Sequence, residues 1–206
     1  MRIIFWGTPE YSVKSLEVLK KSDHDIVAVI TQPDKKRSRG NKLIASPVKE
    51  YATKENIQVF TPETIKDNIQ FIRRLKELSC DLFIVIAYGK ILPKAILDIP
   101  KYKSWNAHAS LLPRWRGAAP IQWSILEGDK FTGVGIMKME EGLDTGDVIV
   151  EKQIKIDSND NLKTLSKRLS DLSSELVLRA LSDIEQNKNR DINLSLIHIS
   201  EPTRPY

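Results

Sequence analysis

Short apolar runs rich in β-branched residues alternate with segments whose apolar residues have helical spacing. This alternation limits the fold more than any other feature of the sequence. Residues 2–6 and 26–31 are two such runs, and they flank a helical pattern over residues 9–22. The helically spaced residues are Val13, Leu16, Val18 and Leu19. A strand, a helix and a second strand in this order predict a βαβ unit, whose two strands lie parallel.

The same alternation continues through the first half of the chain. Two further helices are predicted over residues 47–56 and 63–78, with a short strand over 57–60. The run "DLFIVIAYG", residues 81–89, is continuously apolar, which is typical of a central strand covered on both faces. We therefore expect an α/β fold with a Rossmann-like, doubly wound and mostly parallel sheet.

The second half of the chain adds a different pattern. We expect a short helix over residues 118–126 and a hairpin-like pair of strands over 132–139 and 147–156. Apolar residues then repeat every three to four residues within 162–184, which predicts a long amphipathic helix.

The composition is that of an ordinary globular protein. The chain has 206 residues, of which 41% are hydrophobic and 29% charged, enough for one α/β domain with its own core. No apolar run reaches about 18 residues, and the start of the chain lacks the features of a signal peptide. The single cysteine, Cys80, excludes an internal disulfide. We expect a cytoplasmic monomer without a membrane partner.

Positive charge is concentrated in one short segment. The net charge is +5, and "DKKRSRGNK" contains five basic residues against Asp34. They are Lys35, Lys36, Arg37, Arg39 and Lys42. Such a cluster beside Gly and Ser is typical of a flexible loop that contacts phosphates, but also of a loop that is merely solvated. Composition leaves both interpretations open.

The stretch "SWNAHASLLPRWRGAAP", residues 104–120, contains the first candidate for chemistry. If residues 105–108 end a strand, Asn106 and His108 point to the same face, and the small Ala107 and Ala109 leave room beside them. Downstream, "GLDTGD" places Asp144 in a tight loop. An asparagine and an imidazolium can stabilise a developing oxyanion, and an aspartate can hold the histidine tautomer. A structural histidine and a turn aspartate are the alternatives.

Other familiar sites are absent from the sequence. The first strand is followed by a single glycine, Gly7, rather than the three spaced glycines of a dinucleotide site, and no Walker motif or Gly-x-Ser-x-Gly elbow occurs. His24 and His108 show no metal-ligand spacing with Cys80. We expect no metal.

Two long motifs carry a family resemblance. "NAHASLLPRWRGAAPIQWSILEGD" followed by "TGVGIMKMEEGLDTGD" resembles the folate-dependent formyltransferases, and the likeness extends from residue 2 to about 189. "GTPEYSV", "TQPDKKRSRGNKL", "SPVK" and "AYGKILPKAIL" fit the branch that acts on an aminoacylated tRNA. The resemblance implies the formyltransferase fold and, without a metal, transfer of a formyl group from 10-formyltetrahydrofolate to methionyl initiator tRNA in translation initiation.

Two alternative functions remain at this point. One is a formyltransferase that acts on the amine of a sugar nucleotide or a purine precursor, against which the basic segment argues. The other is a non-catalytic RNA-binding module that keeps the fold, against which the set Asn106, His108 and Asp144 argues.

The resemblance also implies roles for particular residues. The catalytic set would be Asn106, His108 and Asp144. The folate-binding residues would be Ser110, Leu111, Leu112, Pro113, Ile86, Ala87, Tyr88 and Gly89. Arg39 matches a basic residue in the loop that engages the tRNA acceptor end, and Lys35, Lys36, Arg37 and Lys42 would contact tRNA phosphates beside it.

The end of the chain departs from the family. We expect a catalytic domain over residues 1–185, the start of an interdomain linker over 186–193, and no C-terminal β-barrel domain such as full-length members carry. Residues 194–206, "LSLIHISEPTRPY", resemble the translation of a sequencing-library adapter. We therefore expect a truncated chain with a non-native tail, in which His198 has no function.

Overall fold

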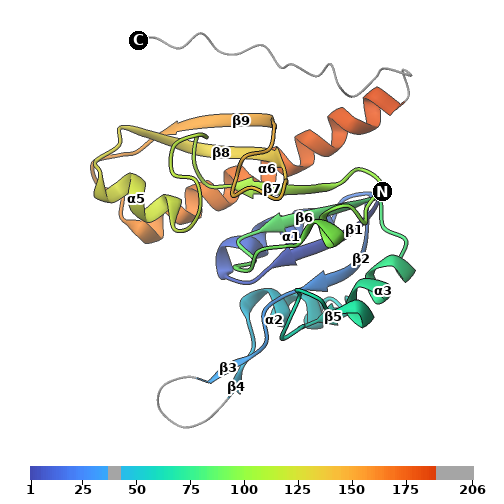
Figure 1. Ribbon diagram of the computed structural model, residues 1–206. Coiled ribbons are helices and arrows are strands. Elements are labelled where there is room, and N and C mark those ends of the chain that lie inside the picture. Colours follow the sequence, from blue (N-terminus) through green and yellow to red (C-terminus); the bar gives the residue numbers. More distant parts are fainter. Residues whose placement is uncertain (37–42, 189–206) are drawn as a thin grey trace.

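A mixed sheet with helices on both faces forms the centre of the computed structural model, which describes residues 1–36 and 43–188 (Figure 1). Within these residues the strand order is β5-β2-β1-β6-β7-β8-β9. The strands are β1 (Arg2–Gly7), β2 (Asp25–Ile30), β5 (Val59–Phe60), β6 (Leu82–Ile86), β7 (Ser104–His108), β8 (Phe131–Lys138) and β9 (Val148–Lys155). The helices are α1 (Glu10–Lys20), α2 (Pro47–Lys54), α3 (Ile69–Glu77), α4 (Lys94–Leu97), α5 (Pro120–Leu126) and α6 (Leu162–Lys188).

The pairing of the strands confirms the predicted fold class. Strands β5, β2, β1, β6 and β7 pair in parallel, whereas β7–β8 and β8–β9 are antiparallel. The chain builds outward from β1 to β2 and β5, then crosses back to place β6 on the other side of β1. A doubly wound sheet of this kind leaves a crevice beyond the carboxyl ends of its central strands.

Alternation of side chains along the strands divides the core into two layers. In β1, Ile3 and Phe5 belong to the layer that α1, α2, α5 and α6 cover, whereas Ile4 and Trp6 belong to the layer that α3 and α4 cover. Successive strand residues point to opposite faces, so a strand covered on both faces needs an unbroken apolar run. β1 and β6 have such runs for this reason.

Two of the expected elements are shorter in the structure. The helix expected over 63–78 begins only at Ile69, because the Asn68 side chain accepts the Phe71 N–H at 3.0 Å and Asp67 has a φ of 57°. Ile69, the first residue of the helix, is 72% exposed. The strand expected over 81–89 ends at Ile86, because Ala87 (φ 48°) and Gly89 (φ 83°) turn the chain away.

The remaining differences are smaller. The helix expected from residue 118 begins at Pro120, since Ala119 has a left-handed φ of 59°. The short helix α4 and a two-stranded ladder of β3 (Lys35–Lys36) and β4 (Leu43–Ile44) were not predicted. Helix α6 runs to Lys188, three residues into the segment predicted as linker. The expected adapter-derived tail, residues 194–206, lies outside the described residues.

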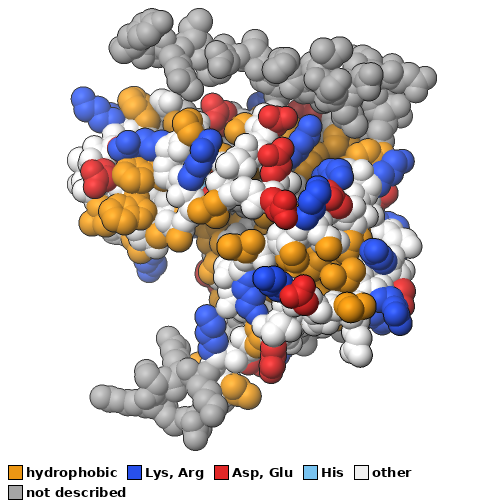
Figure 2. Space-filling model, in the orientation of Figure 1, with side chains coloured by type: hydrophobic (Ala, Val, Ile, Leu, Met, Phe, Trp, Pro, Cys, Tyr) orange, Lys and Arg blue, Asp and Glu red, His pale blue; other side chains and the backbone are white. Residues whose placement is uncertain are grey.

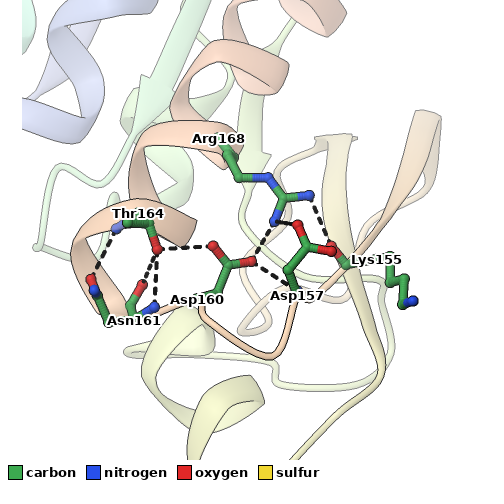
Figure 3. Close-up of polar contacts among 6 residues, drawn as sticks. All are labelled: Lys155, Asp157, Asp160, Asn161, Thr164 and Arg168. Atoms are coloured by element: carbon green, nitrogen blue, oxygen red, sulfur yellow. Dashed lines mark hydrogen bonds and ion pairs between the residues drawn. The ribbon is translucent and has the colours of Figure 1, made fainter.

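A network of side chains fixes the start of α6 at the end of β9 (Figure 3). Asn161 Oδ1 accepts the N–H groups of Lys163 at 2.9 Å and Thr164 at 3.1 Å, which caps the helix. One turn on, the Arg168 guanidinium contacts both Asp157 and Asp160 and donates to the carbonyl oxygen of Lys155 at 2.9 Å. The helix is thereby tied to β9, and its first turns reach the cavity described below.

Replacing Asp160 with asparagine is expected to lower the free energy of unfolding by about 1–3 kcal/mol at pH 7, because the buried acceptor loses its charge facing Arg168. Burial disfavours the Asp160 carboxylate, but hydrogen bonds from the Asp157 N–H and the Thr164 hydroxyl, with the charge of Arg168, outweigh it and hold its pKa below the usual range. A lowered folded-state pKa stabilises the protein above about pH 4, and this contribution disappears as the pH falls through the folded-state pKa.

Urea denaturation at several pH values measures this effect. The difference between wild type and Asp160→Asn should narrow as the pH is lowered below about 4. The control is Asp171→Asn, which removes an exposed i,i+4 pair with Lys167 and should cost no more than about 0.5 kcal/mol. A difference that stays constant from pH 7 to pH 3 would contradict the assignment.

Candidate active site

A cavity of about 670 Å³ opens at the carboxyl ends of β6 and β7, where a doubly wound sheet is expected to bind ligands. Its size suits a small organic molecule. Figure 2 shows the surface hollowed on this side, below the part of the molecule that carries α5. Apolar side chains supply much of the wall: Val85, Tyr88, Ile91, Leu92, Ile121, Met137, Met139 and Leu143.

Three polar side chains meet on one wall of this cavity, and they are the three predicted as catalytic. Asn106 Nδ2 donates to Asp144 Oδ1 at 3.4 Å, and His108 Nδ1 lies 3.6 Å from Asp144 Oδ2. The same Oδ2 accepts the backbone N–H of Gly117 at 2.7 Å. The Asp144 carboxylate therefore connects β7, the loop after β8 and the loop before α5.

Local structure explains how these side chains come together. Asn106 and His108 are two residues apart in β7, so both point toward the cavity, and Ala107 and Ala109 also line it without filling it. Asp144 has a φ of 49°, a left-handed conformation that aspartate adopts more readily than most residues.

A glycine allows the loop that carries Asp144 to fold back. A Cβ on Gly146 would overlap the carbonyl oxygen of Lys138 at the end of β8. The Lys138 N–H donates to the carbonyl oxygen of Asp147 at 2.9 Å and closes the loop. Glycine at this position is therefore part of what places the Asp144 carboxylate opposite β7.

The second nitrogen of His108 is also engaged. Nε2 lies 3.0 Å from the carbonyl oxygen of Trp115, and a carbonyl can only accept, so Nε2 carries a proton and donates it. With Nε2–H on Trp115, Nδ1 is the nitrogen that faces Asp144. When both nitrogens carry a proton, Nε2–H donates to Trp115, whereas Nδ1 lies 3.6 Å from Asp144 Oδ2, an ion-pair contact that is longer than a hydrogen bond.

Only some of the predicted folate-binding residues line the cavity. Ala87, Tyr88 and Gly89 do, in the turn that follows β6. Ile86 lies outside this lining, fully buried in the core layer that faces the helices α1 and α6, and its folate-binding role stays a prediction from the family resemblance.

The segment of residues 110–113 lies outside the lining of this cavity. The Ser110 hydroxyl donates to the carbonyl oxygen of Arg114 at 2.6 Å, and the Leu111 side chain packs over Gly133 of β8. The folate-binding role of Ser110, Leu111, Leu112 and Pro113 stays a prediction from the family resemblance.

Several wall residues were missed at the sequence level. Met137 and Met139 lie two residues apart at the end of β8, and Ile91 and Leu92 follow the turn after β6. All four line the cavity. Ile91 is 80% exposed. Apolar residues that continue past the end of a strand were the signal available for this part of the wall.

The basic segment is described only at its edges. Lys35 and Lys36 form β3, which pairs with β4 and projects from the body of the molecule (Figure 1), and the Lys35 side chain is exposed. An ion pair between Lys49 Nζ and Asp34, at 2.7 Å, holds the base of this hairpin. Arg37, Arg39 and Lys42 lie outside the described residues.

Two other chemistries find little support. Across residues 1–36 and 43–188, no three His, Cys, Asp or Glu side chains are grouped as metal ligands would be. Burial raises the pKa of the Cys80 thiol to about 11, so it is not a thiolate nucleophile at neutral pH.

No helix in the described part of the chain combines the length and apolarity that crossing a bilayer requires.

The fold and the site together agree with the sequence resemblance, and comparison settles the family: the chain belongs to the formyl transferases, whose family model matches residues 1–181. It is 91% identical over 196 residues to a methionyl-tRNA formyltransferase of Prochlorococcus marinus subsp. pastoris (strain CCMP1986 / NIES-2087 / MED4), covering 95% of this chain and 60% of that protein. A methionyl-tRNA formyltransferase of Prochlorococcus marinus (strain MIT 9515) is 84% identical over 193 residues, covering 94% of this chain and 59% of that protein. The chain thus spans about three fifths of the length of these curated relatives.

A solved structure supports the fold independently. Phosphoribosylglycinamide formyltransferase from Bacillus halodurans aligns with a TM-score of 0.75 over 95% of this chain and 100% of that chain, at 22% sequence identity. At this identity the likeness concerns the fold alone, and it confirms the predicted formyltransferase fold.

Proposed function

We propose that this chain transfers a formyl group from 10-formyltetrahydrofolate to the amino group of methionine on initiator tRNA, at the wall formed by Asn106, His108 and Asp144. The observation that supports the acceptor most strongly is the 91% identity with a relative named methionyl-tRNA formyltransferase. The observation that supports the reaction is the Asp144 carboxylate, placed between an amide, a histidine and an apolar cavity.

The cavity fits the proposed formyl donor. Its walls are mainly apolar, as a flat heterocyclic ring requires, and the polar groups of Asn106, His108 and Asp144 meet at the end of β7. When bound, the folate supplies a formyl group whose carbonyl carbon is open to attack by an amine. Lys90 also lines the cavity, with its Nζ donating to the carbonyl oxygen of Glu63 at 2.7 Å.

Each of the three side chains has a task in this reaction. The Asn106 amide and the Nδ1–H of a protonated His108 ring donate hydrogen bonds to the negative charge that develops on the formyl oxygen, while Nε2–H stays on the Trp115 carbonyl. The contact of Asn106 with Asp144 is long, at 3.4 Å, so the amide is available to a stronger acceptor. Asp144 holds the ring of His108 and accepts, directly or through one water, the proton that the attacking amine must lose. The bond between the formyl carbon and the folate nitrogen then breaks, and this nitrogen takes up the proton as tetrahydrofolate leaves.

The basic segment is proposed to bind the acceptor stem of the tRNA. Changing Arg37 and Arg39 together to glutamine is expected to weaken tRNA binding and to reduce the slope of log affinity against log salt by about one per lost phosphate contact. Filter binding at several salt concentrations measures both quantities. The charge-matched control is Arg73→Gln with Lys76→Gln, on exposed positions of α3. Unchanged affinity and salt slope in the loop variant would show that the segment is merely solvated.

One assay with three acceptors tests the function against its alternatives. The purified chain is incubated with 10-formyltetrahydrofolate and, in parallel, with methionyl initiator tRNA, a purine-precursor amine or an amino-sugar nucleotide. We expect formyl-methionine to form in the first reaction only. Product from another acceptor would replace the proposed substrate, and tRNA binding without product from any acceptor would indicate an RNA-binding module.

A further inference from the structure

The orientation of the His108 ring depends on a backbone atom outside the three proposed catalytic side chains. Nε2–H of His108 donates to the carbonyl oxygen of Trp115 at 3.0 Å. If this carbonyl moves, Nε2 loses its acceptor, and the position of Nδ1 relative to Asp144 is no longer fixed. The groups that hold the Trp115 carbonyl in place therefore also fix the orientation of the His108 ring.

The backbone at Trp115 is in a conformation that its own sequence does not favour. Trp115 has a left-handed φ of 59°, and Gly117 and Ala119 follow with φ values of 88° and 59°. Residues with a side chain adopt this conformation only when their surroundings impose it. Trp115 therefore needs anchors elsewhere in the structure.

Asp129 supplies these anchors from the loop that follows α5. Its Oδ2 accepts the indole N–H of Trp115 at 2.6 Å, and its two oxygens accept from Arg114 Nη2 at 2.7 Å and Nε at 3.0 Å. Asp129 is itself fixed, since its N–H donates to the carbonyl oxygen of Ser124 at 2.9 Å. The hydrogen bonds from Arg114 lower the pKa of the Asp129 carboxyl most, and partial burial opposes them. With the further hydrogen bond from Trp115, the pKa stays below its usual range.

The Trp115 ring has two further contacts. The Arg114 guanidinium lies 4.2 Å from its centre, and the Trp123 ring of α5 is stacked with it at 5.9 Å and an interplanar angle of 13°. Arg114 is held in turn by the Ser110 hydroxyl, which donates to its carbonyl oxygen. By contrast, neighbouring Arg116 is exposed and makes no ion pair with the described residues.

We propose that Asp129 is a positioning residue for the formyl transfer: through the Trp115 indole and the Arg114 guanidinium it holds the Trp115 carbonyl against Nε2–H of His108. Asp129 is not among the residues that line the cavity, so it acts without touching the reactants. The proposal rests on the proposed function for its kinetic consequence, but not for its effect on the His108 ring.

The alternative is a surface ion pair that contributes only a little stability. Arg114 is 57% exposed, and pairs at such exposure contribute little to folding. A purely structural role for Asp129 predicts a small change in Tm and nothing else. A positioning role predicts, with the same small change in Tm, a lower kcat and a changed environment of the His108 nitrogens.

The test compares wild type with Asp129→Ala in kinetics and in nitrogen-15 NMR of the imidazole rings, with His108 assigned from a His108→Gln spectrum. We expect kcat to fall about 10- to 100-fold. KM for 10-formyltetrahydrofolate should be nearly unchanged, Tm should fall by no more than about 4 °C, and the Nε2 resonance of His108 should shift. Trp115→Phe keeps the ring stack but removes the indole donor, so it should reproduce these changes if Asp129→Ala does not fold.

A matched control removes a comparable ion pair elsewhere. Asp98 bridges Lys94 and Lys103 at 2.8 Å each on the surface, so Asp98→Ala should leave kcat and the His108 resonances unchanged. Wild-type kcat and wild-type His108 resonances in folded Asp129→Ala would overturn the proposal. If wild type shows no formyl transfer while the resonance of the variant still shifts, the proposed function fails and the positioning role stands.

Discussion

Replacing Asp144 with alanine is expected to lower the rate of formyl transfer at least 100-fold while the protein stays folded. Losing one group that stabilises transition-state charge typically lowers the rate of an enzyme by about 100- to 1000-fold. The carboxylate accepts the Gly117 N–H at 2.7 Å and faces both Asn106 and His108. Alanine removes all three contacts at once, together with the group that receives the proton of the amine. Single-turnover formation of formyl-methionyl-tRNA measures the loss.

A second substitution separates the charge of Asp144 from its role as an acceptor. Asp144→Asn keeps an oxygen for the Gly117 N–H but places a neutral amide opposite His108, so it should remain slow while the loop before α5 stays in place. Asp147→Ala, on the exposed end of the same loop, is the control and should transfer formyl groups at nearly the wild-type rate. Near-normal turnover in Asp144→Ala would remove this residue from the mechanism.

Replacing Asn106 with alanine is expected to lower the same rate by about 100- to 1000-fold, because the formyl oxygen loses one of its two hydrogen-bond donors. The loss should appear in kcat with little change in KM for the donor, since the interaction forms as charge develops. Steady-state kinetics at varied concentrations of 10-formyltetrahydrofolate separates the two constants.

The control for Asn106 removes an amide elsewhere. Gln70→Ala changes an exposed position on α3 and should leave both constants unaltered. A circular dichroism spectrum and Tm close to wild type establish that Asn106→Ala is folded. If this folded variant turned over at the wild-type rate, the amide would have no part in the transition state.

The sequence was most informative where backbone geometry and apolar patterning agree. The parallel strands β1, β2 and β6, the hairpin of β8 and β9, and the long helix α6 were predicted from their apolar patterns. The pattern is clearest in β1 and β6, whose apolar runs are buried, and weakest in β9, where only Val150 is buried. The predictions failed where single residues in left-handed conformations interrupt a pattern. Asp67 delays α3, Ala87 ends β6 and Ala119 delays α5, and none of these residues is a glycine or proline that would have marked the break.

In the site, too, some features could be predicted from the sequence and others could not. The shared face of Asn106 and His108 follows from the two-residue period of a strand, whereas their meeting with Asp144, which lies 38 residues beyond Asn106, was implied by the family resemblance and not by spacing. The role of Asp129 could not be predicted from either source. It depends on a backbone carbonyl, whose direction is set by the tertiary packing of Trp115 on α5.

The location of the formyl donor tests the central claim most directly. A crystal structure of this chain with a non-reactive analogue of 10-formyltetrahydrofolate should place the analogue in the cavity beyond β6 and β7. Its formyl oxygen should lie about 2.6–3.2 Å from Asn106 Nδ2 and from a His108 ring nitrogen. An analogue bound elsewhere, or in the cavity with its formyl oxygen turned away from both side chains, would contradict the account.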